Sequence, residues 1–276
     1  MVRSGADVPA EKILPFGFFE LDMFECPPFV MFSSGDVPVL TYIFDEGTFE
    51  PCSMRLWCRL AKSATGFLDI GANVGIYSLA AAKLRPDLLV HAFEPNPYAY
   101  ARLRVHKHVN NLPNLVEHCV GVHLKSGLAV FTWLVKPHGN VSSGACPFLE
   151  PGEGRESAAV RLERIDGSGL AATLGVRPLV KVDVEGAEAL VFDAMKEVLA
   201  LRPDIIVETF DQNACDAINA HLLPLGYDVY SIHEKDGFLR RKERLTPCDV
   251  FDPHHDFNQF LTCRPRTEIQ GAMNVA

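Results

Sequence analysis

Three carboxylates stand where apolar runs end, which is where a protein of alternating strands and helices presents side chains to ligands: Asp183, Glu185 and Glu208. By the two-residue period of a strand, Lys181, Asp183 and Glu185 share one face. Charged residues are rare in apolar strands, so their presence indicates chemistry. Carboxylates that lie close together can provide a general base, because neighbouring negative charges raise its pKa, or they can provide oxygen ligands for Mg²⁺. A structural ion pair between Lys181 and Glu185 is the alternative.

A glycine turn is the second feature. In FLDIGANVG, Gly71 and Gly75 follow an apolar run that contains Asp69, and Glu94 ends the next run. Glycines let the chain turn tightly and let a ligand approach the backbone N–H groups that open a helix. The third glycine of the GxGxxG dinucleotide pattern is absent. Asp69 suits the ammonium of an amino-acid tail, directly or through water, and S-adenosylmethionine has such a tail whereas NAD does not.

Glu94 is expected to accept hydrogen bonds from both hydroxyls of a ribose, because it ends the second strand. Both cofactor classes share that position, so Glu94 does not discriminate between them. The alternative for Asp69 and Glu94 is that they only cap the helices that follow.

Alternating patterns supply the elements that position these residues. Strand-like runs alternate with helical ones, which favours parallel strands joined by helical crossovers. We expect strands at 66–71, 88–94, 114–122, 178–184, 203–209 and 226–232, helices at 73–86, 96–111, 186–201 and 213–225, an extra strand at 128–135 and a last, antiparallel strand at 257–265. The expected fold class is α/β, a doubly wound Rossmann-like sheet.

Composition excludes some partners. A formal charge of −9 and the absence of a clustered cationic face argue against nucleic acid. The run RRKERL at 240–245 is interpreted as a solvated loop or helix face. No apolar run approaches the roughly 20 residues that cross a bilayer, and the eight cysteines show no metal-ligand spacing. We therefore expect a cytoplasmic protein with no membrane or nucleic-acid partner, and a homo-oligomer is compatible with the sequence.

Four motifs, LDIGANVGIYSL, AFEPNP, LVKVDVEGAEALVF and PDIIVE, occur in an order and spacing that resemble the FkbM-type family of class I S-adenosyl-L-methionine-dependent methyltransferases. The resemblance implies a seven-stranded methyltransferase sheet in the order 3-2-1-4-5-7-6, mostly parallel with one antiparallel strand. It also implies O-methylation of a small molecule or a saccharide. Carried over by position, the cofactor-binding residues are Asp69, Gly71, Ala72, Asn73 and Gly75 around the methionine tail, and Glu94, Pro95 and Asn96 at the ribose.

The expected organisation has a small N-terminal extension or cap at 1–48 and a methyltransferase domain at 49–265. Within the domain, 136–157 is a loop insertion rich in Gly, Ser and Pro, and 234–256 is an insertion before the last strand. Residues 266–276 form a C-terminal tail. Because long loops often carry function, we expect 136–157 to belong to the acceptor pocket or its lid.

The catalytic residues are expected to be Asp183, Glu185 and Glu208, with Asp183 foremost. A protonated hydroxyl is a poor nucleophile, so a base or a metal must activate it. We assign no metal ligands, Mg²⁺ stays open, and His233 or His254 is the alternative base. Two other function classes stay open: a nicotinamide-dependent oxidoreductase on a similar sheet, and a protein that binds S-adenosylmethionine without catalysis.

Overall fold

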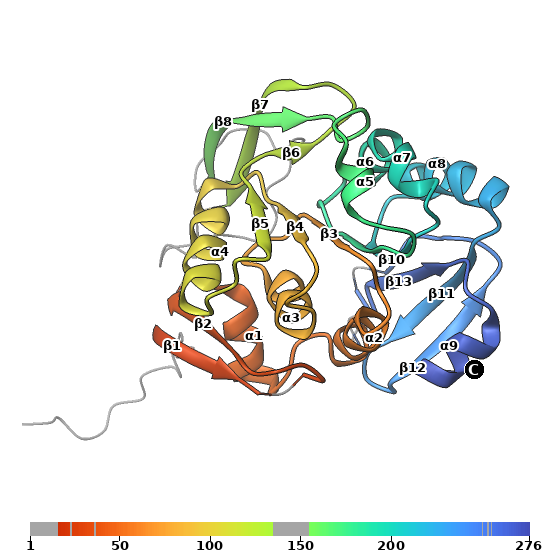
Figure 1. Cartoon of the computed structure of the whole chain (residues 1–276), viewed down its shortest axis with the longest axis horizontal. Coiled ribbons are helices and arrows are strands. Elements are labelled where there is room, and N and C mark those ends of the chain that lie inside the picture. The colour runs from red at the N-terminus through yellow and green to blue at the C-terminus, as the bar shows by residue number, and fades with distance from the viewer. Residues whose placement is uncertain are drawn as a thin grey trace, which may run out of the picture.

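One mixed β-sheet runs through the molecule, with helices on both of its faces (Figure 1). The computed structural model describes residues 16–22, 24–35, 37–134, 155–249, 251–252, 254 and 256–276. In spatial order the nine strands are β14 (Asn274–Val275), β12 (Phe238–Lys242), β11 (Asp228–His233), β13 (Asn258–Thr262), β10 (Asp204–Glu208), β9 (Leu179–Val182), β3 (Phe67–Ile70), β4 (Val90–Phe93) and β5 (Leu115–His118).

Two hydrophobic cores lie on the two faces of this sheet. The first packs against α1 (Pro38–Glu46), α2 (Pro51–Ala61), α3 (Ile76–Leu84), α4 (Pro97–Val109) and α9 (Arg266–Ala272). The second packs against α5 (Leu170–Thr173), α6 (Glu188–Ala194), α7 (Lys196–Leu199), α8 (Gln212–Leu222) and the 3₁₀ turn Leu223–Leu225. The central strands β3, β9 and β10 are buried on both faces, which explains why apolar residues predominate in them.

The expected strand order is present in this sheet. Read from β5, the order β5-β4-β3-β9-β10-β13-β11 is 3-2-1-4-5-7-6 in chain order. β13 pairs antiparallel with both β10 and β11, as expected for the last strand. The α/β class and the doubly wound arrangement are therefore confirmed.

The expected count of seven strands with one antiparallel member is wrong. β12 pairs antiparallel with β11, and β14 pairs parallel with β12, so three of nine strands run against the rest. β12 lies in the segment 234–256 that we interpreted as an insertion. Gly237, with φ +70°, lies in the hairpin turn between β11 and β12. Because Arg240 and Arg241 are charged, the sequence of this strand was interpreted as a solvated loop or helix face. β14 lies in the expected tail.

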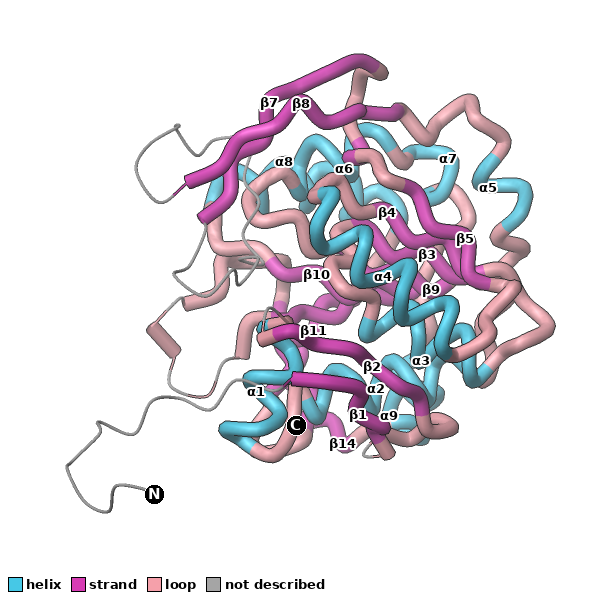
Figure 2. The backbone as a smooth tube through the Cα atoms, turned by 90° about the vertical axis from the view of Figure 1, so that its left-hand side faces the viewer, coloured by secondary structure: helices cyan, strands magenta, loops and turns pink. Residues whose placement is uncertain are grey.

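Two smaller sheets flank the main one, and Figure 2 shows them at opposite ends of the molecule. β1 (Phe16–Leu21) and β2 (Phe29–Ser34) form a hairpin whose residues pack into the first core. β6 (Gly121–Val122), β8 (Arg155–Glu163) and β7 (Gly127–Leu134) form the other, and β7 is the extra strand expected at 128–135. Most of the loop expected at 136–157 lies outside the described residues. Over the described ranges no helix combines the length and the apolar character needed to cross a membrane.

Candidate active site

The glycine turn after β3 is fixed by the ends of both neighbouring strands. The N–H groups of Gly71 and Ala72 both donate to the carbonyl of Phe93, at 2.9 and 3.0 Å. On the other side, the Asp183 N–H donates to the carbonyl of Ile70 at 2.9 Å. Gly71 has φ +83°, and a Cβ placed there would lie 1.6 Å from the carbonyl oxygen of Asp183. Glycine is required here because the backbone after β9 occupies the space of a side chain.

Glu94 links the end of β4 to the turn. Its Oε2 accepts from the backbone N–H of Asn73 and its Oε1 from that of Asn96, both at 2.7 Å. Burial raises the pKa of Glu94 to about 7, although these two hydrogen bonds oppose the shift. The Asn96 side chain caps α4, because its Oδ1 accepts from the N–H of Tyr98 at 3.0 Å. Each Glu94 oxygen keeps a second lone pair, which can accept from a ligand hydroxyl.

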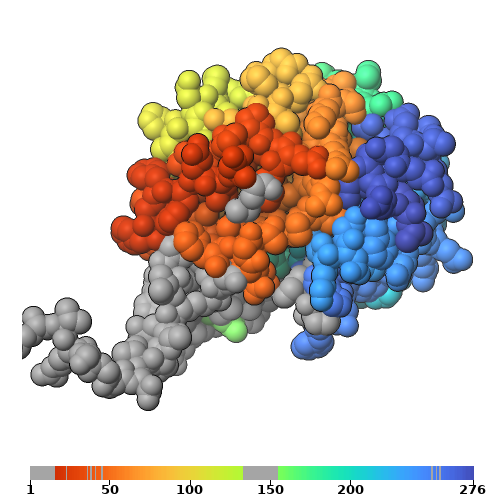
Figure 3. Space-filling view, turned by 90° about the horizontal axis from the view of Figure 1, so that it is seen from below, coloured from red at the N-terminus to blue at the C-terminus, as the bar shows by residue number. Residues whose placement is uncertain are grey.

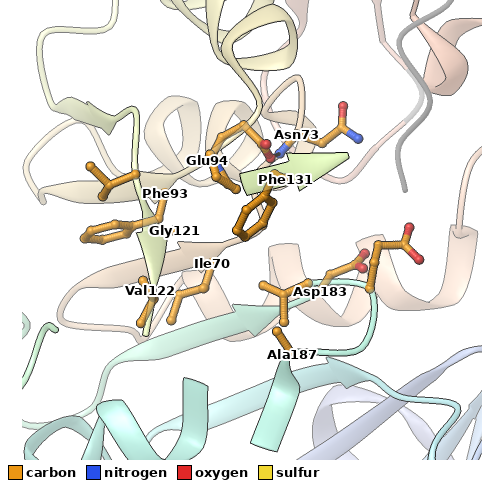
Figure 4. Close-up of a pocket in the computed structure, with 14 residues that line it drawn as sticks. Ile70, Asn73, Phe93, Glu94, Gly121, Val122, Phe131, Asp183 and Ala187 are labelled. Carbon is orange, nitrogen blue, oxygen red and sulfur yellow. Dashed lines mark hydrogen bonds between the residues drawn. The ribbon is translucent and has the colours of Figure 1, made fainter. Parts of the chain in front are cut away.

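A cavity opens between this turn and the ends of β4 and β9 (Figure 4). Its apolar wall is formed by Ile70, Phe93, Val120, Val122 and Phe131, and its polar wall includes Asn73, Glu94, Asp183 and Glu185. Its volume is about 80 Å³, below the roughly 300 Å³ at which small-molecule pockets usually begin. A nucleoside must therefore extend past the mouth of the cavity or displace lining side chains such as Phe131.

Asp183 reaches this cavity from the end of β9 and is held by Lys181. The Lys181 ammonium lies 3.2 Å from Asp183 Oδ2, and Lys181 is buried whereas Asp183 is about 30% exposed. The alternative pairing of Lys181 with Glu185 is therefore replaced by one with Asp183. Burial alone would lower the pKa of Lys181, but Asp183, Glu50 and Glu208 outweigh it and raise the pKa above its ordinary value. Lys181 is therefore a buried cation that interacts electrostatically with several carboxylates.

Glu185 and Glu208 gather near Asp183, as expected. Glu185 lines the same cavity, but φ +53° places it past the strand, so the two-residue period does not extend to it. Burial, and then Asp183, raise the pKa of Glu185 to about 7. The pKa of Glu208 is raised well above normal by burial and then by Asp183. Like charges thus accumulate at this edge and contribute to the raised pKa values of both groups.

Four of the eight expected cofactor residues lie on the cavity wall: Gly71, Asn73, Glu94 and Pro95. The other four are placed behind it or beside it. Ala72 is buried, Asn96 caps α4, and Gly75 opens α3 with φ +91° where Leu103 packs against it. Asp69 is buried in β3, its Oδ2 accepts from the Ser78 hydroxyl at 2.5 Å, and burial raises its pKa to about 6. A contact of Asp69 with the methionine tail remains a prediction.

Sequence reasoning missed a second layer of polar residues behind Asp183. Asn258, on β13, accepts from Lys181 Nζ at 3.1 Å and donates to Glu50 Oε2 at 2.8 Å. The Tyr77 hydroxyl also donates to Glu50. Glu50 precedes Pro51 at the start of α2 and has φ +41°. Local sequence patterns cannot predict the contact between Glu50 and Asn258, which are 208 positions apart.

The chemistry of the cavity wall fits the nucleoside part of S-adenosylmethionine. Glu94 presents oxygen acceptors of the kind that ribose hydroxyls need, and the side chains of Ile70, Phe93 and Val122 form an apolar surface on which a base could pack. Within the described ranges, no cluster of three or more His, Cys, Asp or Glu side chains is arranged to hold a metal ion.

Comparison with known proteins relates the chain to a methyltransferase family. Residues 69–229 match the family model described as the methyltransferase FkbM domain, which is more than half of the chain. The chain is 25% identical over 185 residues to the curated 31-O-demethyl-FK506 methyltransferase FkbM of Streptomyces tacrolimicus, which covers 56% of this chain and 68% of that protein.

Solved structures with a similar fold include two methyltransferases. A SAM-dependent methyltransferase from Agrobacterium tumefaciens has a TM-score of 0.45 and 11% identity, covering 91% of this chain and 71% of its own. Precorrin-6y C5,15-methyltransferase from Geobacter metallireducens GS-15 has a TM-score of 0.40 and 14% identity, covering 78% and 86%. The assignment depends on the family match and not on these two likenesses.

Proposed function

The chain belongs to the FkbM methyltransferase family, and we propose that it transfers a methyl group from S-adenosylmethionine to a hydroxyl oxygen of a small molecule or saccharide. The relative from Streptomyces tacrolimicus supports oxygen as the acceptor atom, since its name describes a substrate that lacks an O-methyl group. The observation that carries the proposal is that Glu94, from the cofactor turn, and Asp183, a candidate base, line one cavity.

In this mechanism one residue binds the cofactor, a second takes a proton and a third orients that base. When bound, S-adenosylmethionine supplies a methyl group on a sulfonium sulfur, and the carbon–sulfur bond breaks as the acceptor oxygen takes the methyl carbon. Glu94 accepts from the ribose hydroxyls and thereby fixes the nucleoside. Asp183 takes the proton of the acceptor hydroxyl, which otherwise makes the oxygen a poor nucleophile. Lys181, whose ammonium lies 3.2 Å from Oδ2, orients the carboxylate.

Asp183 acts as a base in this proposal rather than as a Mg²⁺ ligand. The ammonium of Lys181 lies against Asp183 Oδ2, and it would repel a divalent cation bound to the same carboxylate. Chelation tests this directly. EDTA should leave the rate of methyl transfer unchanged, and loss of the activity with recovery on addition of Mg²⁺ would assign Asp183 to a metal site instead.

The proposed function is tested by identifying the product. Cell extract is incubated with the protein and S-adenosylmethionine carrying an isotopically labelled methyl group, and mass spectrometry then locates the label. The expected product carries the label on an oxygen of a small molecule or saccharide. Label on nitrogen or carbon would contradict O-methylation, and the absence of labelled product beside tight binding of S-adenosylhomocysteine would indicate a binding protein without turnover.

A further inference from the structure

A second, larger cavity has Glu50 in its lining. Its volume is about 670 Å³, within the roughly 300–1,000 Å³ of sites that hold small molecules. One wall comes from α1 and the loop before α2, and the other from the segments that follow β11 and precede β13. Figure 3 shows a face of the molecule where the orange segment that contains α2 adjoins the blue C-terminal part of the chain.

Aromatic side chains form much of the apolar lining. Tyr42, Phe49 and Phe257 all lie on the wall, and the Tyr42 and Phe49 rings meet edge to face with centroids 6.3 Å apart. Phe257 meets Phe210 in a similar way at 5.3 Å. Rings held by ring contacts offer rigid faces on which the C–H surface of a ligand can pack.

The polar lining is predominantly acidic. Glu46, Glu50 and Glu234 contribute carboxylates, against one lysine, Lys235, and one histidine, His254. Ionised carboxylates only accept hydrogen bonds, so they suit a ligand that presents donors such as hydroxyl groups. When ionised, the same groups repel phosphate and carboxylate groups. Aromatic faces beside acceptors are thus matched to a polyhydroxylated ligand without negative charge.

Two of these carboxylates are already fixed in place. Glu234 Oε2 accepts from the backbone N–H of Cys52 at 2.8 Å, and its other oxygen accepts from the Ser53 hydroxyl, so it caps α2. Glu50 is held by Asn258 at 2.8 Å and by the Tyr77 hydroxyl. A preorganised wall loses little entropy when a ligand binds.

A continuous chain of contacts joins this cavity to the catalytic edge. From Glu50 the contacts run to Asn258 at 2.8 Å, to Lys181 at 3.1 Å and to Asp183 at 3.2 Å. Glu50 lines the larger cavity and Asp183 lines the smaller one. Asn258 and Lys181 thus link Glu50 on the wall of the larger cavity to the base assigned above.

We propose that the cavity lined by Phe49, Glu50 and Phe257 binds the methyl acceptor, and that this acceptor is an uncharged polyhydroxylated molecule of the saccharide class. The inference rests on the proposed methyl transfer. It adds where the acceptor binds and that the acceptor carries no negative charge. α1 supplies one side of the site, so substrate choice depends on residues far from the cofactor turn in sequence.

The test uses the full chain and two probes from one cell extract. Anion exchange separates small molecules into an unretained fraction, without negative charge, and a retained, anionic fraction. Each is incubated with labelled S-adenosylmethionine and wild-type protein. The label should enter the unretained fraction, on a compound that mass spectrometry identifies as a polyol. Incorporation only into the retained fraction or into macromolecules would overturn the proposal.

Variants of α1 then test the location. Tyr42 and Glu46 line the cavity, and Tyr42 is 40% exposed, so Tyr42→Ala and Glu46→Gln should fold normally. Phe44, on the same helix and 54% exposed, is absent from the described lining, and Phe44→Ala is the matched control. Each lining variant should raise the KM for the labelled acceptor roughly threefold to tenfold, with unchanged affinity for S-adenosylhomocysteine.

Failure of the two proposals can be told apart. If wild-type protein labels no compound in either fraction, the proposed function falls and this inference falls with it. If the wild type labels a compound but Tyr42→Ala and Glu46→Gln behave as Phe44→Ala does, methyl transfer stands and the acceptor site is elsewhere.

Discussion

Replacing Glu94 with glutamine should weaken cofactor binding without unfolding the protein. Each carboxylate oxygen of Glu94 accepts one backbone N–H at 2.7 Å and keeps a lone pair for the ribose. An amide of the same shape retains one acceptor and turns an NH₂ group toward a backbone donor. Hydrogen bonds to a charged group contribute about 1.5–3 kcal/mol, so losing one should weaken binding of S-adenosylhomocysteine roughly tenfold to a hundredfold.

Isothermal titration with S-adenosylhomocysteine measures this effect. The matched control is Glu117→Gln, because Glu117 lies on the neighbouring strand β5, pairs with Lys107 and is absent from the described cavity lining. The control should bind as the wild type does. Wild-type affinity in a folded Glu94→Gln protein would refute the assignment of Glu94 to the ribose.

Two further predictions concern the stability of the ligand-free protein. Gly71→Ala should lower the free energy of unfolding by roughly 1–3 kcal/mol or more, because a Cβ would lie 1.6 Å from a backbone carbonyl oxygen. Gly127→Ala is the control, because a Cβ there would have no atom within 4 Å, and it should not destabilise the protein. Equal denaturant midpoints for the two variants would contradict the turn geometry. Burial raises the pKa of Glu94, Glu185 and Glu234 to about 7, so the folded state binds more protons than the unfolded state and stability should fall as pH rises from about 4.5 to about 7. Thermal melting across this range checks the sign, and a smaller fall is expected in Glu185→Gln; a rise that Glu185→Gln does not alter would count against raised pKa values.

Local patterns were enough to predict the cofactor side of the site. The turn at Gly71, the strand that precedes Glu94 and the helix that ends before Pro86 each depend on neighbouring residues. Period and glycine placement determine such features directly, and they predicted Asp183 at the end of its strand. The strand order 3-2-1-4-5-7-6 was instead implied by the family resemblance.

Other features depend on contacts between distant parts of the chain, and they could not be predicted from local sequence patterns. Asn258 joins Lys181 to Glu50 across two sequence gaps, and only the pairing of β13 with β10 brings it there. Phe131 reaches the cofactor cavity because β7 belongs to a separate small sheet that lies over it. β12 was missed because the adjacent, exposed Arg240 and Arg241 outweighed the single buried residue Leu239.

The most direct test of the account is methyl transfer by Asp183→Asn. Asparagine keeps the shape of the side chain but cannot take the hydroxyl proton, so the rate of labelled methyl transfer should fall by on the order of 10²–10⁴-fold, the usual contribution of a positioned base. Affinity for S-adenosylhomocysteine should stay close to that of the wild type. Full activity in a folded Asp183→Asn protein would contradict the account, and would leave alignment alone, or another base such as His254, as the source of the rate.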